Sequence, residues 1–187
     1  EALRRQWGAA ESDGVVLYVG RLAAEKNLEV LLQAFASMRR TDPRLRLVLV
    51  GDGPLRESLR QRCPEAVLAG QRSGIDLAAH YASADLFLFP SLTETFGNVT
   101  PEAMASGLPV LAFDHAAAGQ LIEHGENGWL VPHGDSSAFV QFALNLSCDK
   151  TSLHRVGQAA RTRALELGWG DILRQIEGVF ISALIAH

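Results

Sequence analysis

The feature that most constrains this chain is the regular alternation of short apolar runs with helical segments. Six apolar runs, each three to six residues long, alternate with stretches in which apolar residues recur every three or four positions. The runs cover residues 15–19, 45–50, 66–69, 86–89, 110–113 and 129–131, and Arg46 is the one polar residue within them. Continuous apolar runs of this length are typical of parallel strands buried on both faces. We therefore predict an α/β fold, a doubly wound, Rossmann-like parallel sheet of about six strands.

Length and composition fit one soluble domain. The chain has 187 residues, 48% of them hydrophobic and 20% charged, with a net charge of −4 and no basic stripe. That balance argues against nucleic-acid binding, and no apolar run is long enough to span a membrane. Cys63 and Cys148 do not make a disulfide framework, which favours a cytoplasmic location.

The two ends of the chain carry predictions of their own. We expect residues 1–14 to be a linker or a frayed end, and residues 15–187 to form one ligand-binding domain. Two further helices are predicted at 152–167 and 171–186. The last carries an apolar stripe, for which core packing is favoured over docking to an absent partner domain or to a membrane surface.

In doubly wound sheets, ligands bind beyond the carboxyl ends of the strands. Two loops at that edge carry polar residues, one following Gly20 and one following residue 89. The first contains Arg21 and Lys26, two cations that suit a diphosphate. The alternative is a solvated loop in which they pair with Glu25 or Glu29.

The second loop leads into a short helix. Thr100, Pro101 and Glu102 are predicted to be its N-cap, first-turn proline and first-turn carboxylate, and Gly107 is predicted to follow its end. Unpaired N–H groups at a helix start suit a phosphate, and carboxylates suit the hydroxyls of a sugar. Together they favour a nucleotide-sugar site.

Glu94 and Glu102 would face one crevice if the second loop folds back. The alternatives are an exposed loop glutamate beside one that only complements the helix dipole, or a glycosidase-type pair, which has less support. The six histidines lack metal-ligand spacing, and we expect no metal site. The chain also lacks a P-loop, a G-x-G-x-x-G motif and a nucleophile elbow.

Taken together, these segments resemble the donor-binding half of retaining GT-B glycosyltransferases of family 4 (glycosyl transferases group 1). The resemblance rests on an ordered set of motifs over about residues 3–180: 20-GRL-22 with 25-EKN-27, 50-VGDGP-54, 84-AD-85, 90-PS-91, 94-ETFGNVTPEAMASGLPV-110 and 125-GENG-128. The run 113-FDHAAA-118 is most similar to members that use GDP-mannose, although tyrosine commonly stands where this chain has His115.

The resemblance implies a role for each matching residue. Arg21 and Lys26 would hold the donor diphosphate, Glu94 would bond sugar hydroxyls near the reacting carbon, and Glu102 would bind the ribose. Arg21, Lys26 and Glu94 would be the catalytic residues. The donor-binding set would comprise Gly20, Arg21, Lys26, Glu94, Phe96, Gly97, Asn98, Val99 and Glu102, with backbone N–H groups of residues 96–99 facing sugar and phosphate.

The resemblance further implies a metal-independent enzyme without a cofactor, which transfers a hexose from GDP-mannose or a UDP-sugar to an acceptor hydroxyl with retention. The acceptor-binding N-terminal domain would be missing, so this part alone would be inactive. Peripheral membrane association of the full enzyme stays open. The alternatives are a stand-alone nucleotide-sugar-binding module and a sugar-nucleotide epimerase of the same architecture.

Overall fold

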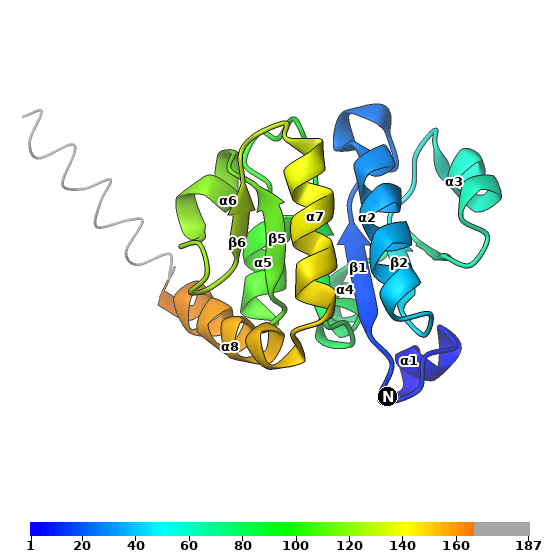
Figure 1. Ribbon diagram of the computed structural model, residues 1–187, viewed down its shortest axis with the longest axis horizontal. Coiled ribbons are helices and arrows are strands. Elements are labelled where there is room, and N and C mark those ends of the chain that lie inside the picture. Colours follow the sequence, from blue (N-terminus) through cyan, green and yellow to red (C-terminus); the bar gives the residue numbers. More distant parts are fainter. Residues whose placement is uncertain (167–187) are drawn as a thin grey trace, which may run out of the picture.

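The computed structural model describes residues 1–166, which form a six-stranded parallel sheet with helices on both faces (Figure 1). The strands lie in the order β3-β2-β1-β4-β5-β6. Their bounds are β1 Val15–Val19, β2 Arg46–Val50, β3 Val67–Gly70, β4 Leu86–Phe89, β5 Val110–Phe113 and β6 Trp129–Val131. The predicted α/β fold and its six strands are confirmed. The helix predicted at residues 171–186 lies outside the described residues.

The helices cover the sheet in two layers. In Figure 1, α2 and the yellow α7 lie side by side in front of the sheet, with α4 and α5 behind it. Helix α8 runs past the amino ends of the strands and packs against α5. The helix bounds are α1 Ala2–Gln6, α2 Leu28–Thr41, α3 Arg56–Arg62, α4 Gly74–Ala82, α5 Val99–Ala105, α6 Ala116–Leu121, α7 Ser136–Ser147 and α8 Lys150–Glu166, with a 3-10 turn, η1, at Ala24–Lys26. Among residues 1–166, no helix is both long and apolar enough to cross a membrane.

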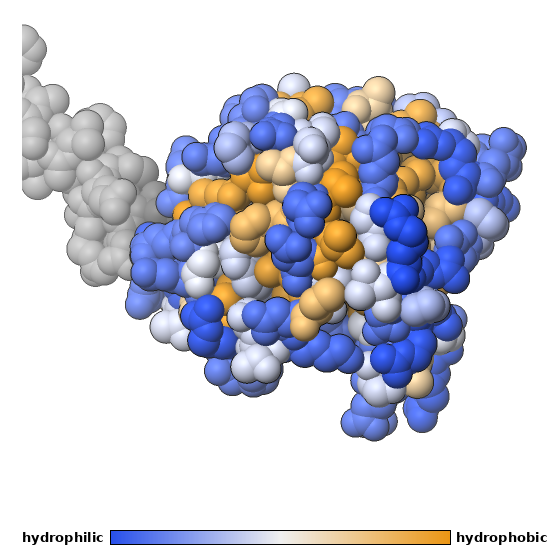
Figure 2. Space-filling view, in the orientation of Figure 1, coloured by the Kyte–Doolittle hydropathy of each residue, from blue (hydrophilic) through white to orange (hydrophobic). Residues whose placement is uncertain are grey.

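The core follows from the apolar runs. Every residue of β1, β4 and β5 is buried, as expected for central strands covered on both faces. Phe87 and Phe89 stack on each other along β4, and Tyr18 of β1 stacks on Phe89. Figure 2 shows apolar residues gathered near the middle of the surface on the side of α2 and α7, with polar residues around them. The aromatic stack leads from the core to the carboxyl ends of β1 and β4.

Two predicted helix starts need correction. Thr100 is not an N-cap, since α5 begins at Val99 and has Asn98 as its N-cap. The reason is that Thr100 N donates to Gly97 O at 3.0 Å, so the first turn already forms before Thr100. The sequence also predicts a brief helix near residues 119–123, but helix α6 begins at Ala116. Asparagine favours a helix N-cap, so the sequence predicts Asn27 in that position before the second helix. Asn27 is the N-cap of α2, but its backbone is left-handed and its side chain makes no capping hydrogen bond.

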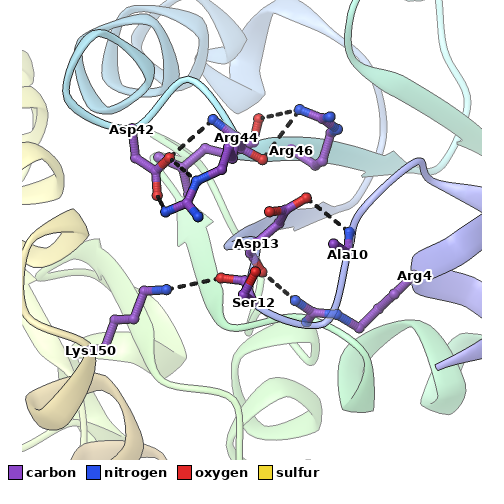
Figure 3. A network of polar contacts seen from close by, with 9 residues as sticks. Arg4, Ala10, Ser12, Asp13, Asp42, Arg44, Arg46 and Lys150 are labelled. Carbon is purple, nitrogen blue, oxygen red and sulfur yellow. Dashed lines mark hydrogen bonds and ion pairs between the residues drawn. The ribbon is translucent and has the colours of Figure 1, made fainter.

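The N-terminal residues are not frayed. Residues 2–6 form α1, and Arg4 holds this helix to the domain by donating to Ser83 O at 3.0 Å and to the Asp85 carboxylate at 3.1 Å. The same guanidinium bonds Asp13 O, a contact that belongs to a polar network at the amino ends of the strands (Figure 3). Segment 1–14 is therefore docked on the domain, because two distant acceptors converge on one partly buried arginine.

Candidate functional site

The two loops that carry the predicted residues meet where the strand order reverses. Strand β1 lies between β2 and β4, so the chain leaves β1 towards one side of the sheet and leaves β4 towards the other. Such a switch point opens a crevice at the carboxyl edge. A pocket of about 250 Å³ lies there, lined by Val19, Gly20, Lys26, Phe89, Glu94, Thr95, Phe96, Gly97, Asn98 and Val99. Seven of the nine predicted donor-binding residues line this pocket.

Lys26 and Glu94 form the polar centre of the pocket. Lys26 Nζ lies 2.5 Å from Glu94 Oε1, and both side chains are largely buried, at 16% and 15% exposure. Lys26 also donates to Thr93 O at 3.0 Å. This ion pair joins residues 68 positions apart in the sequence. The alternative in which Lys26 pairs with Glu25 or Glu29 does not hold, and Glu29 pairs instead with Arg62.

Only one oxygen of Glu94 is held by the protein. Ser91, which is 3% exposed, donates its hydroxyl to Glu94 Oε1 at 2.8 Å, so Oε1 accepts from both Ser91 and Lys26. Glu94 Oε2 has no hydrogen bond from any residue in the described part of the chain. A carboxylate has about four acceptor positions, so Glu94 keeps the capacity to accept from hydroxyl groups.

Arg21 lies at the rim and does not line the pocket. Its side chain is 67% exposed and lies 3.7 Å from Glu25, a contact that agrees with the alternative of local pairing in a solvated loop. Its carbonyl is fixed, since the Tyr18 hydroxyl donates to Arg21 O at 3.1 Å. Burial, the Glu94 charge and the Glu25 charge, in that order, raise the pKa of Tyr18, so its hydroxyl stays a donor.

Glu102 also does not line the pocket. It points to α4, where the buried Tyr81 hydroxyl donates to Glu102 Oε2 at 2.9 Å. The structure therefore brings Lys26 and Glu94 into contact, while the Glu102 carboxylate contacts α4 and is not part of the pocket lining. Its position in the first turn of α5 also fits the dipole alternative.

The loop that carries Glu94 is anchored from three neighbouring segments. Leu92 N donates to Glu25 O at 3.3 Å, and Leu92 O accepts from His133 Nε2 at 3.0 Å. Ala117 N donates to Phe96 O at 2.8 Å. Within residues 1–166, the N–H groups of residues 96–98 have no hydrogen-bond partner. This loop thus offers fixed, available N–H donors beside the ion pair.

Glycines bring the loops after β1 and β2 into contact. A Cβ on Gly51 would lie 1.9 Å from Gly20 O, and one on Gly53 would lie 2.4 Å from Leu22 O. The two loops are also joined by the bond from Leu22 N to Asp52 O at 2.9 Å. Residues 51-GDG-53 were quoted from the sequence only as part of a family motif, and in the structure they support the loop that carries Lys26.

Sequence analysis missed Ser91 and Tyr81 as site residues. Ser91 lay within a motif that was quoted for the resemblance, directly after a predicted strand, so its position was a usable signal. Tyr81 lay in an amphipathic helix, and no local pattern points from it to a carboxylate 21 residues away. Its contact depends on how α4 and α5 pack.

A hollow of about 400 Å³ lies at the opposite, amino edge of the sheet. Its wall includes Asp13, Asp42 and Lys150, each of which already has a protein partner (Figure 3). No group of three metal-ligating side chains occurs anywhere in residues 1–166. The chemistry therefore points to the smaller pocket.

Fold and site together define a GT-B glycosyltransferase domain. The structure matches Anabaena Alr3699/HepE, solved in complex with UDP and glucose, with a TM-score of 0.81 and 28% identity over 97% of this chain and 51% of that chain. The C-terminal domain of LpcC, a glycosyl transferase group 1 family protein from Francisella tularensis, matches with a TM-score of 0.75 over 88% of this chain and 91% of that one. At 20% identity, the LpcC match shows the fold alone.

The chain belongs to the glycosyl transferases group 1 family, whose model matches residues 13–149. It is 40% identical over 175 residues to a GDP-mannose-dependent alpha-mannosyltransferase from Corynebacterium glutamicum. That alignment covers 94% of this chain but 41% of the relative, so the chain spans less than half the length of this curated protein. The predicted family resemblance is confirmed.

Proposed function

We propose that this chain is the donor-binding half of a retaining glycosyltransferase that transfers a hexose from a nucleoside-diphosphate sugar to an acceptor hydroxyl. The observation that carries the proposal is the Lys26–Glu94 ion pair, formed across the switch point inside the pocket. Support for GDP-mannose comes from the name of the Corynebacterium relative, and support for a UDP-sugar comes from the ligands of the Anabaena structure. The acceptor would bind to a second domain of the whole enzyme.

The pocket residues suit separate parts of such a donor. Lys26 would bind the diphosphate, and its charge would stabilise the negative charge that develops as the bond from the anomeric carbon to the diphosphate breaks. Arg21 at the exposed rim would add a second cation. Glu94 would accept from sugar hydroxyls through Oε2, and the available N–H groups of residues 96–98 would donate to sugar and phosphate oxygens. Glu102 would accept from the ribose.

None of these roles needs a metal or a cofactor. Lys26 is held between two acceptors, Glu94 Oε1 and Thr93 O, so its charge is already directed at the pocket before a ligand arrives. A fixed charge in a partly buried site stabilises charge separation more than a solvated one, because little reorganisation is required. We assign the cationic role chiefly to Lys26.

The test is calorimetric binding of GDP, UDP, ADP and their sugars to the 187-residue chain. Lys26→Ala should weaken binding of the preferred nucleotide by about 1–3 kcal/mol, the scale of a lost charge-assisted hydrogen bond. The chain has one other lysine, Lys150, which donates to Ser12 O at the amino edge. Lys150→Ala is therefore the matched control and should bind as the unchanged chain does. Equal affinities for the unchanged chain, Lys26→Ala and Lys150→Ala would rule out the role assigned to Lys26.

The role of Glu102 has its own test. Glu102→Gln should reduce affinity for the nucleoside diphosphate more than affinity for inorganic pyrophosphate, because only the former has a ribose. Equal losses for both ligands would exclude a ribose contact. Thermal unfolding of each variant checks that the fold is retained.

A further inference from the structure

The contact between Tyr81 and Glu102 has no part in the roles described above. Tyr81 is 2% exposed, and its ring is fixed edge-on against the Phe87 ring, with centroids 5.8 Å apart. Its hydroxyl donates to Glu102 Oε2 at 2.9 Å. A buried hydroxyl needs a partner, and the structure gives it a carboxylate from a neighbouring helix instead of a main-chain carbonyl.

This donor fixes a side chain that would otherwise be free to rotate. Glu102 is exposed, and Glu102 Oε1 has no hydrogen bond from any other residue in the range 1–166. The chain thus holds one carboxylate oxygen from the core and leaves the other available, as Ser91 and Lys26 do for Glu94. Burial and the charge of Glu102, in that order, raise the pKa of Tyr81, which keeps its hydroxyl protonated and able to donate.

We infer that Tyr81 is a positioning residue, which holds the Glu102 carboxylate in the orientation that accepts the two hydroxyls of the donor ribose. This inference rests on the proposed function. A carboxylate with about four acceptor positions can bond Tyr81 and still accept from both ribose hydroxyls. Ordering Glu102 before binding removes part of the entropy cost that a ligand would otherwise meet.

The test compares Tyr81→Phe with the unchanged chain for three ligands: the preferred nucleoside diphosphate, its 2′,3′-dideoxy form and inorganic pyrophosphate. Phenylalanine keeps the ring and its packing on Phe87 and removes only the hydroxyl. We expect about a 3- to 10-fold loss of affinity for the nucleoside diphosphate, the range for ordering one long side chain. Affinities for the other two ligands should change less than about 2-fold, because neither has a ribose diol.

A double-mutant cycle tests whether Tyr81 acts through Glu102. In the Glu102→Ala background, adding Tyr81→Phe should weaken binding of the nucleoside diphosphate by less than about a further 2-fold, because the carboxylate that Tyr81 holds is already gone. The matched control is Tyr18→Phe, which removes another buried hydroxyl, the one bonded to Arg21 O. Any loss from Tyr18→Phe should be equal for the nucleoside diphosphate and its dideoxy form.

The outcomes separate this inference from the function on which it rests. Equal losses for all three ligands, or a full additional loss in the Glu102→Ala background, would mean that Tyr81 has only a structural role. An unchanged chain that binds none of the nucleotides would overturn both the proposed function and the inference. If the unchanged chain prefers the ribose form but Tyr81→Phe retains that preference, only the inference is wrong.

Discussion

The two edges of the sheet carry similar charged groups that serve different purposes. At the amino edge, Asp42 pairs with Arg44 two residues away, and Lys150 donates to a main-chain carbonyl (Figure 3). At the carboxyl edge, Lys26 and Glu94 come from distant loops and meet inside a pocket. The amino edge has the larger hollow of the two, so volume alone does not mark a site. A site is marked instead by distant polar groups that converge and keep free acceptor and donor positions.

The largest expected effect on stability comes from replacing Gly51, whose close approach to Gly20 O joins the two loops at the carboxyl edge. Gly51→Ala should destabilise the fold by about 3 kcal/mol, because the new Cβ would lie 1.9 Å from Gly20 O and the backbone φ of +134° is strained for alanine. Gly125→Ala is the matched control, since Gly125 also has a positive φ but has nothing within 4 Å of the added Cβ. It should cost about 1 kcal/mol. Urea unfolding measures both, and equal costs would show that the contact between the loops adds nothing.

Next comes the arginine that holds α1 at the amino edge. Arg4→Ala should cost about 2 kcal/mol of stability, because it removes hydrogen bonds to Ser83 O, Asp13 O and the Asp85 carboxylate. The neighbouring Arg5 is exposed, and Arg5→Ala should leave the unfolding midpoint unchanged. Nucleotide affinity should not change in either variant. A weaker affinity in Arg4→Ala would break the functional separation of the two edges.

A smaller effect is expected for Ser91. Ser91→Ala should lower stability by about 1 kcal/mol, since it removes one hydrogen bond to the Glu94 carboxylate. It should also reduce affinity for the sugar nucleotide relative to the nucleoside diphosphate, because Glu94 faces the sugar in the proposed function. Ser106→Ala, which removes a serine bonded only to the Glu102 carbonyl, is the control and should leave that ratio unchanged. If both variants change the ratio alike, Ser91 does not act through Glu94.

The smallest effect should come from Asp42. The side-chain bond from Arg44, and then the Arg44 backbone N–H, lower the pKa of the Asp42 carboxyl below its ordinary 3.8. A lowered pKa stabilises the fold above that ordinary value and loses its effect as the pH falls below it. Asp42→Asn should therefore lower the unfolding temperature by less than about 2 °C at pH 7, because the pair is exposed. The difference should shrink progressively as the pH falls below 3.8, and a difference that grows there would contradict the direction of this pKa shift.

Much of the fold could be predicted from local pattern. The six apolar runs became the six strands. Asp135 stands before two serines and has the chemistry of an N-cap, and its carboxylate accepts from Ala138 N at 2.9 Å. Helix starts were less predictable, because Thr100 has the chemistry of an N-cap but a turn at Gly97 forms the first turn before it. The N-terminal segment looked like a linker, since its polar composition does not reveal that Arg4 reaches Asp85, 81 residues away.

The sequence by itself determined the strands, their burial and the two polar loops, because each depends on the spacing of neighbouring side chains. It also determined the family, since the ordered motifs lie along the chain. Only the tertiary structure decided which polar groups meet. It paired Lys26 with Glu94, left Arg21 with Glu25 at the rim, and set Tyr81 against Glu102. Those contacts depend on how the loops and helices pack across the sheet, and local spacing does not encode a distance between segments that are remote along the chain.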